Sequence, residues 1–241
     1  GTRTGRTACA EPNLQQIPRE GIIKRLYCSR WGRERGYIYQ ADLSQIELRL
    51  LAAACGDASM VEAYWNGTDL HSLTHSKIYG KPYDQCTNEH MEWLQRNGRD
   101  TEAKRLKEER KVAKTVNFLT GYGGGAFGLQ TSLASQGIYK SLEECEQILE
   151  SFFDSYPALR QFLSYVAVSI MGRVRVFEEI FGNDSEAQNK ALRAGCNHLI
   201  QSTASDMMVT CLAAIDDIMR AEGMESILVS TVHDSLLIDA V

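Results

Sequence analysis

The sequence predicts an α+β fold, with a small antiparallel sheet and a larger helical region. Residues 37–41, Tyr-Ile-Tyr-Gln-Ala, have the composition of a strand, which would end at Asp42. A second strand is predicted over 227–232, and residues 235–241 would return as a third strand after a tight turn. Between the first strand and the second, apolar residues recur mostly at helical spacing, which indicates helices.

The composition sets limits on the class of protein. The 241 residues are 44% hydrophobic, enough for a core and one or two domains. No run of about 18 apolar residues predicts a membrane span. The seven cysteines are odd in number and lack C-x-x-C spacing, which favours reduced thiols in an intracellular protein over a disulfide framework or a zinc site. The first residue is glycine and no initiating Met is present, as in a fragment of a longer protein.

Charge is unevenly distributed along the chain. The formal net charge of -5 argues weakly against a nucleic-acid binder. Basic residues nevertheless cluster before Asp42 and again over 104–114, so one surface of the protein can be positive although the net charge is negative. Taken alone, either cluster is equally compatible with a solvated face.

Capping residues and glycines place the helices. Ser44 with Glu47 three residues later predicts a capped helix start, and Ser141 with Glu144 predicts another. Asn97-Gly98 indicates a turn within the polar stretch 81–109. The other predicted segments are helices over 60–64, 71–79, 102–110, 110–119, 158–171 and 187–221, and a short hairpin over 174–181.

Two aspartates stand at predicted strand ends, far apart in the sequence. Asp42 lies in Asp-Leu-Ser-Gln-Ile-Glu-Leu-Arg, and Asp234 follows Val-His. Magnesium prefers hard oxygen ligands and usually takes one or two carboxylates, so this pair suits a two-metal site, with the Leu43 carbonyl as a further ligand. The alternative is that Asp42 caps the following helix and Asp234 is a turn residue.

Four side chains recur every four residues on the helix that follows. Arg110, Lys114, Phe118 and Tyr122 therefore share one broad face. Cations followed by aromatic rings suit a nucleoside triphosphate. The alternative is an ordinary amphipathic helix with snorkelling cations. Glycines 123–125 follow the end of a helix, so they indicate a stop and not a phosphate loop.

These motifs, in this order, resemble the polymerase domain of the family A DNA polymerases. The resemblance covers nearly the whole chain, and it implies a right-hand fold with an antiparallel-sheet palm and helical fingers. The palm would comprise residues 1–56 and 187–241, the fingers residues 57–186, and the thumb and the C-terminal end of the palm would be absent. The implied reaction is template-directed addition of dNMP to a primer 3'-end, in DNA replication or repair.

The resemblance also implies roles for individual residues. Asp42, Leu43 and Asp234 would hold two Mg²⁺ ions, and the two aspartates would be catalytic. The nucleotide-binding set implied is His71, Arg110, Lys114, Phe118, Tyr122 and Glu47, with Glu47 excluding ribose. The set implied for primer and template is Arg6, Arg193, Asn197, Gln201 and His233. The implied partners are primer-template DNA and dNTPs, in a bacterial cell or a virus-infected host.

Several positions depart from the family pattern. Ser235 stands where the family usually has glutamate, and Leu43 where tyrosine is common. Residues 81–109 are longer than the usual link into the cationic helix. Phe118 replaces the tyrosine of some members, which implies discrimination against nucleotides lacking a 3'-hydroxyl.

Three other functions are compatible with parts of this pattern. A single-subunit RNA polymerase shares the two aspartates and the cationic helix, although Glu47 argues against it. A DNA-binding fragment without catalysis is compatible with Ser235. A generic helical domain would require all of these motifs to be chance matches.

Overall fold

The computed structural model describes residues 4–11, 13–17, 22–32, 34–166, 183–232 and 234–241. It contains two compact units. The first comprises Gly1–Ile46 and His198–Val241, and the second comprises Glu47–Asn197. Within the described residues, no helix is both long and apolar enough to cross a membrane.

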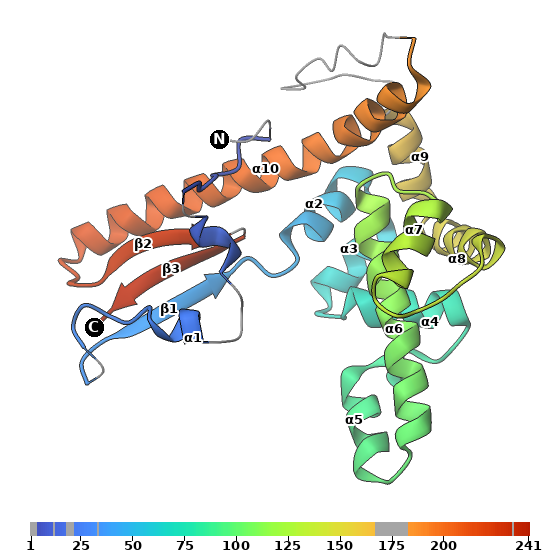
Figure 1. Ribbon diagram of the computed structural model, residues 1–241, viewed down its shortest axis with the longest axis horizontal. Coiled ribbons are helices and arrows are strands. Elements are labelled where there is room, and N and C mark those ends of the chain that lie inside the picture. The colour runs from blue at the N-terminus through green and yellow to red at the C-terminus, as the bar shows by residue number, and fades with distance from the viewer. Residues whose placement is uncertain (1–3, 12, 18–21, 33, 167–182, 233) are drawn as a thin grey trace. The chain divides into compact units, whose positions relative to one another are not determined.

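The first unit contains a three-stranded antiparallel sheet (Figure 1). Its strands are β1 (Tyr37–Asp42), β2 (Ile227–Val232) and β3 (Ser235–Ala240), arranged in the order β1-β3-β2. The register pairs Tyr37 with Ala240 at one end and Asp42 with Ser235 at the other. This sheet confirms the predicted strands, and β3 lies at its centre although it is the last strand of the chain.

The rest of the first unit consists of short helical segments and part of a long helix. The segments are η1 (Leu14–Gln16) and α1 (Ile22–Arg25), and the long helix is α10 (Ser185–Ala221), which continues from the second unit. Gln15 Nε2 donates a hydrogen bond to the Thr231 carbonyl at 3.3 Å. The hydroxyls of Thr7 and Thr231 lie 3.1 Å apart. The N-terminal segment therefore lies against β2.

The second unit is helical. Its elements are α2 (Ile46–Cys55), α3 (Ala58–Trp65), α4 (Leu70–Tyr79), η2 (Tyr83–Cys86), α5 (Asn88–Arg96), α6 (Asp100–Gly121), α7 (Ala126–Ala134), α8 (Leu142–Ser155), α9 (Pro157–Val166) and the first part of α10. The side chains of Asp57, Asp69 and Thr87 accept hydrogen bonds from the first turns of α3, α4 and α5. The predicted capping box of Ser141 and Glu144 is present at α8.

Some predicted boundaries need correction. The segments predicted over 102–110 and 110–119 form one continuous helix, α6, because no glycine or proline interrupts its buried stripe. Helix α2 begins at Ile46, two residues after the predicted capping residue Ser44. The residue directly before the helix is Gln45, which has a positive φ of 53°. Helices α5 and α7 were not predicted. The predicted hairpin 174–181 and the end of the helix predicted over 158–171 lie outside the described residues.

Helix α6 packs against several neighbours. Val112, Ala113, Val116, Asn117 and Thr120 on its inner face are almost fully buried. A smaller core joins the first turns of α6 to α5, through the apolar side chains of Met91, Leu94, Ala103 and Leu106. Burial of this kind stabilises a helix pair by roughly 25 cal/mol for each Å² of apolar surface removed from water. The polar segment 81–109 is therefore folded, with α5 and the first turns of α6 as a helical hairpin.

Candidate active site

The sheet brings the two predicted carboxylates to one of its ends. Asp42 is the last residue of β1 and pairs with Ser235, the first residue of β3. The Leu43 N–H donates a hydrogen bond of 2.9 Å to the carbonyl of Asp234. Asp42 is exposed and Asp234 is half-buried. Two carboxylates from distant parts of the sequence therefore stand at one end of the sheet, Asp42 at the end of β1 and Asp234 in the turn directly before β3.

A cation lies beside one of these carboxylates. Arg6 Nη2 is 3.4 Å from Asp234 Oδ1. The two side chains also line a small hollow with Gln15, Ser205 and other residues of α10. Because the N-terminal segment lies against β2, Arg6 reaches the same end of the sheet as the carboxylate pair.

Ser235 has a structural role in the turn between β2 and β3. It is buried, its Oγ donates to the Val232 carbonyl at 2.8 Å, and it accepts a 2.8 Å hydrogen bond from Gln40 Nε2. The hydroxyl therefore ties β1 to the turn that carries Asp234. This arrangement gives Ser235 a positioning role in the turn.

The oxygen atoms present suit a hard divalent cation. The described residues contain no group of three or more His, Cys, Asp or Glu side chains arranged to hold a metal. Magnesium, however, usually takes only one or two protein carboxylates and completes its shell with water and substrate phosphates. Asp42 and Asp234 meet that requirement. The Leu43 carbonyl accepts a hydrogen bond from Ile46 N–H at 3.2 Å and keeps a second lone pair.

In the second unit, α6 presents a cationic and aromatic surface. Lys114 and Phe118 are exposed, and Lys114 Nζ lies 5.9 Å from the centroid of the Phe118 ring. The imidazole of His71 lies 5.6 Å from the same ring, at an interplanar angle of 42°. Three of the predicted nucleotide-binding side chains are therefore neighbours.

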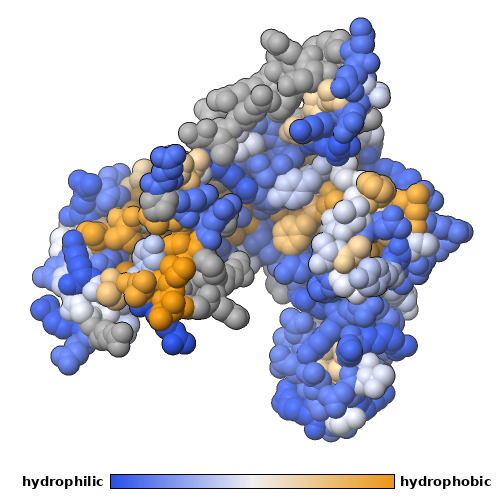
Figure 2. All heavy atoms as spheres, in the orientation of Figure 1, coloured by the Kyte–Doolittle hydropathy of each residue, from blue (hydrophilic) through white to orange (hydrophobic). Residues whose placement is uncertain are grey.

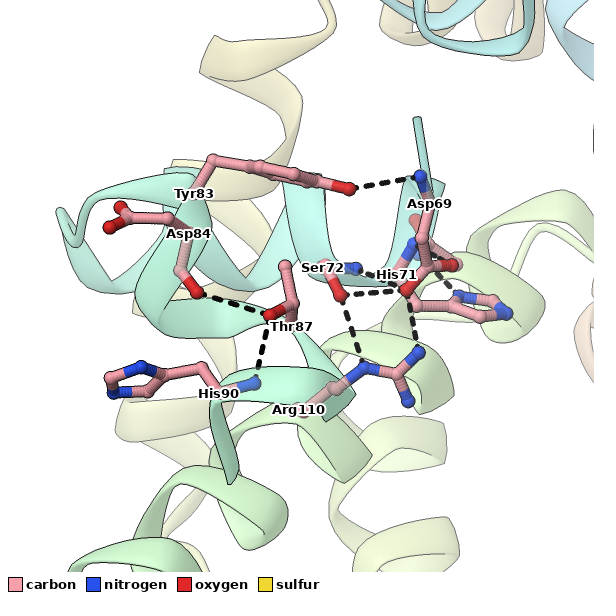
Figure 3. A network of polar contacts seen from close by, with 9 residues as sticks. Asp69, His71, Ser72, Tyr83, Asp84, Thr87, His90 and Arg110 are labelled. Atoms are coloured by element: carbon pink, nitrogen blue, oxygen red, sulfur yellow. Dashed lines mark hydrogen bonds and ion pairs between the residues drawn. The ribbon is translucent and has the colours of Figure 1, made fainter. Parts of the chain in front are cut away.

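Arg110 is held by the beginning of α4 (Figure 3). Its Nη2 donates to Asp69 Oδ2 at 2.6 Å, and its Nε donates to Ser72 Oγ at 3.2 Å. Burial alone would raise the pKa of Asp69, but the hydrogen bonds from Ser72 and Arg110 outweigh it and hold that pKa below its ordinary value. The Arg110 side chain is 18% exposed, and its ion pair with Asp69 already neutralises part of its charge.

His71 is buried in this structure. Its Nδ1 lies 3.0 Å from Nδ2 of Asn117, which is itself 1% exposed. Burial lowers the pKa of His71 to about 4, and the charges of Arg110 and Lys114 act in the same direction. The imidazole is therefore neutral at physiological pH, and Asn117 fixes the orientation of its ring.

Glu47 and Tyr122 form a direct pair. The Tyr122 hydroxyl donates a 2.5 Å hydrogen bond to Glu47 Oε2, which joins the first turn of α2 to the end of α6. A carboxylate held in this way has a defined position. That is the property required of a side chain that excludes a substituent by steric contact.

The residues predicted to bind DNA are distributed over both units. Arg193 and Asn197 line a groove of about 670 Å³ with Tyr122 and the glycines that follow α6. A Cβ atom on Gly123, whose φ is 66°, would lie 3.5 Å from Arg193 Cγ, so the chain passes close to α10 there. Gln201 is half-buried on the part of α10 in the first unit. His233 lies outside the described residues.

Two residues of the site were not predicted from the sequence. Asp69 both caps α4 and pairs with Arg110, and Asn117 orients His71. The available signal for Asp69 was an aspartate, a preferred capping residue, just before the predicted helix 71–79. Nothing local marked Asn117, because its partner is 46 residues away.

Comparisons with known proteins agree on one family. The family model described as DNA polymerase family A matches residues 1–241. The DNA polymerase I of Chloroflexus aurantiacus is 32% identical over 255 residues, covering 100% of this chain and 24% of that protein. The DNA polymerase of Bacillus phage SP01 is 29% identical over 258 residues, covering 99% of this chain and 26% of that protein.

A solved structure shares the fold. It is the POL domain of Pol1 from M. smegmatis in complex with DNA primer-template and dNTP. The TM-score is 0.78 and the identity is 28%, covering 98% of this chain and 40% of that one. The chain thus spans about a quarter of the length of its curated relatives.

Proposed function

The chain belongs to DNA polymerase family A, and from this we propose that it forms part of a template-directed DNA polymerase that adds dNMP to a primer 3'-end. The observation that carries the proposal is the placement of Asp42, at the end of β1, and Asp234, directly before β3, at the same end of the sheet. The relative solved with primer-template DNA and dNTP supports the same substrates for this chain.

In this proposal Asp42 and Asp234 hold two magnesium ions, with the Leu43 carbonyl as an additional ligand. When bound, such ions supply Lewis-acid stabilisation of the attacking and leaving oxygens. The residues of the chain position these ligands: Ser235 and Gln40 fix the turn, and the β1–β3 register sets the separation of the strands. Arg6, which pairs with Asp234 in this structure, is assigned to the primer end.

The second unit binds the incoming dNTP. Lys114 and Arg110 contact the triphosphate, because both cations stand on α6 and Lys114 lies beside the exposed Phe118 ring. Arg110 exchanges part of its hydrogen bonding from Asp69 to phosphate. Neutral His71 contributes a hydrogen bond and not a charge, since burial keeps its pKa at about 4.

Discrimination between sugars depends on Glu47 and Tyr122. The hydrogen bond between them holds the carboxylate in one position. In this proposal a ribose 2'-hydroxyl beside it would leave the carboxylate crowded and desolvated. This favours dNTPs over rNTPs, and therefore a DNA polymerase over a single-subunit RNA polymerase. Phe118 at its position favours nucleotides that carry a 3'-hydroxyl.

Template and primer contacts are assigned to polar side chains on α10 and to Arg6. Arg193, Asn197 and Gln201 recur every four residues on one helix and can probe minor-groove acceptors shared by all correct base pairs. His233 completes this proposed set. The assignment of residues 1–56 and 187–241 to a palm, and of 57–186 to fingers, remains a prediction, as does an intracellular role in replication or repair.

Primer extension with magnesium tests the proposal. The full-length protein should extend a primer with dNTPs and not with rNTPs, and Asp42→Asn and Asp234→Asn should each abolish extension. Asp216→Asn is the control, since that half-buried carboxylate forms an ion pair with Arg220, one turn away on α10, and is not among the residues assigned to the site. Unchanged extension by either variant of the pair would overturn the assignment.

A further inference from the structure

Four polar side chains form a hydrogen-bonded chain inside the second unit, and we refer to them together as the relay. They are His71 and Thr74 of α4, Asn117 of α6, and Tyr156, the residue directly after α8. The hydroxyl oxygens of Tyr156 and Thr74 lie 3.1 Å apart. Thr74 Oγ1 donates to Asn117 Oδ1 at 3.0 Å, and Asn117 Nδ2 lies 3.0 Å from His71 Nδ1. The relay therefore joins the end of α8 to a residue of the proposed nucleotide site.

The relay is buried, whereas most polar side chains of this unit lie at its surface. Figure 2 shows a hydrophilic surface over the limb that α5 and the first turns of α6 form in Figure 1. Thr74 and Tyr156 are 0% exposed, Asn117 is 1% exposed and His71 is 5% exposed. A hydroxyl or an amide that leaves water is costly to bury unless it is hydrogen-bonded. Each member of the relay therefore depends on its neighbour for a partner.

The available donors and acceptors give the relay one direction. A hydroxyl has a single proton to donate, and Thr74 donates its proton to Asn117 Oδ1. The contact between Thr74 and Tyr156 must therefore use the phenol as donor. Burial raises the pKa of Tyr156 to about 12, so the phenol keeps its proton at neutral pH.

The same count of donors determines the tautomer of the histidine. Because the amide oxygen of Asn117 faces Thr74, its amide nitrogen faces His71 Nδ1. An amide nitrogen only donates, so Nδ1 must be an acceptor without a proton. The single proton of the neutral imidazole is therefore on Nε2.

Packing holds the far end of the relay. The centroid of the Tyr156 ring lies 5.1 Å from that of Phe152 and 4.4 Å from Lys77 Nζ. Lys77 Nζ also donates to the Ser155 carbonyl at 3.3 Å. Helix α4 thus contacts the end of α8 through both Thr74 and Lys77, which gives the phenol a defined position.

We propose that Tyr156, Thr74 and Asn117 are positioning residues that hold His71 as its Nε2–H tautomer, so that the ring offers a hydrogen-bond donor to the phosphates of the incoming dNTP. The inference deepens the proposed function of His71 and rests on it. A neutral imidazole has one donor nitrogen and one acceptor nitrogen, and only the donor is complementary to a phosphate oxygen. With the other tautomer, Nε2 would present a lone pair and repel the phosphate.

The test measures whether His71 Nδ1 carries a proton. The full-length protein is labelled with ¹⁵N-histidine and studied at neutral pH by magic-angle-spinning NMR, which separates protonated from unprotonated ring nitrogens by their chemical shifts. The signals of His71 are those lost in His71→Gln. Because no nucleotide is present, this readout does not depend on polymerase activity.

Three variants alter the relay in different ways. Thr74→Ser keeps the hydroxyl and should keep Nδ1 unprotonated. Thr74→Val keeps the shape of the side chain but leaves the Asn117 amide without the donor that orients it, so Nδ1 should become partly protonated. Asn117→Asp replaces the amide donor by an acceptor, so Nδ1 should become protonated. Thr210→Val is the matched control, since it removes an exposed hydroxyl that bonds the Asp206 carbonyl on α10.

The effect on the nucleotide is measured by steady-state primer extension. Thr74→Val should raise the KM for dNTP about fivefold, the equivalent of one hydrogen bond, and should raise KM more than it lowers kcat. Thr74→Ser should restore the KM of the unaltered protein, and Thr210→Val should leave it unchanged. A loss of packing alone would not be reversed by serine, which lacks the methyl group of threonine.

Three results would overturn the relay. They are a protonated Nδ1 in the unaltered protein, a fully unprotonated Nδ1 in Thr74→Val, and an unprotonated Nδ1 in Asn117→Asp, the variant that decides if Thr74→Val does not fold. The predicted NMR changes with an unchanged KM would overturn the nucleotide part of the proposal instead. In that case the relay would set the tautomer of a histidine that the dNTP does not contact.

Discussion

Asp69 has two separable functions, and substitutions can remove one or both. Its carboxylate accepts from His71 N–H at 3.3 Å and Ser72 N–H at 3.1 Å at the start of α4, and it also pairs with Arg110 at 2.6 Å. Asp69→Asn keeps a good capping residue but loses the charge, whereas Asp69→Ala loses both. The difference between the two variants therefore measures the cap, and the asparagine variant measures the ion pair.

The structure gives the expected magnitudes. Loss of a capping side chain costs about 1 kcal/mol. Loss of the charged hydrogen bond to Arg110, a side chain only 18% exposed, costs about 2 kcal/mol. We therefore expect Asp69→Asn to lower the free energy of unfolding by about 2 kcal/mol and Asp69→Ala by about 3 kcal/mol. At about 2–4 °C for each kcal/mol, the alanine variant should melt about 6–12 °C lower.

The assay is urea denaturation together with thermal melts. It is applied to the two Asp69 variants, to Arg110→Gln, and to the double variant that combines Asp69→Asn with Arg110→Gln. The double-variant cycle should give a coupling energy of about 2 kcal/mol between the two side chains. Because the pKa of Asp69 is lowered from 3.8 in the folded protein, this stability is complete above pH 3.8 and is lost as the pH falls through the lowered value. A coupling energy near zero, or equal losses in both Asp69 variants, would refute the reasoning.

Three further predictions follow from the site. The pKa of His71 is about 4 in the folded protein and ordinarily 6.5, so the unfolded chain binds more protons than the folded protein between these two pH values. The free energy of unfolding should therefore fall as the pH falls from 6.5 to about 4. Denaturation of His71→Gln at several pH values should show a weaker dependence on pH. Ser235→Ala should lower the free energy of unfolding by about 1–3 kcal/mol, because Gln40 Nε2 loses its acceptor; an unchanged urea midpoint would contradict the role of this hydroxyl. Glu47→Ala should raise the ratio of rNTP to dNTP incorporation in single-turnover assays, while Tyr122→Phe, which keeps the carboxylate, should raise it less.

The sequence predicted the sheet well because its signals are local. Short runs rich in β-branched and aromatic residues end at Asp42 and Val232, and the turn before Ser235 brings the last strand back. The position of β3 between the other two strands depends on pairing across the whole chain. Helix α5 was missed because it is strongly polar, and its two buried residues, Met91 and Leu94, have meaning only beside Ala103 and Leu106 of α6.

The site was predicted as a set of residues but not as a set of contacts. The spacing on α6 placed Lys114 and Phe118 on one face correctly. It could not show that Arg110 is already paired with Asp69, since those residues are 41 positions apart and meet only through the packing of α4 on α6. For the same reason, a lone histidine gave no sign that His71 is buried against Asn117.

The number of metal ions bound by the assembled complex tests the central claim most directly. Mn²⁺, which electron paramagnetic resonance detects, is titrated into the full-length protein with a chain-terminated primer, template and the next correct dNTP. The account predicts two bound ions for the unaltered protein, fewer for Asp42→Asn and for Asp234→Asn, and two for the Asp216→Asn control. The same number of ions in all four proteins would contradict the assignment of Asp42 and Asp234 as the metal ligands.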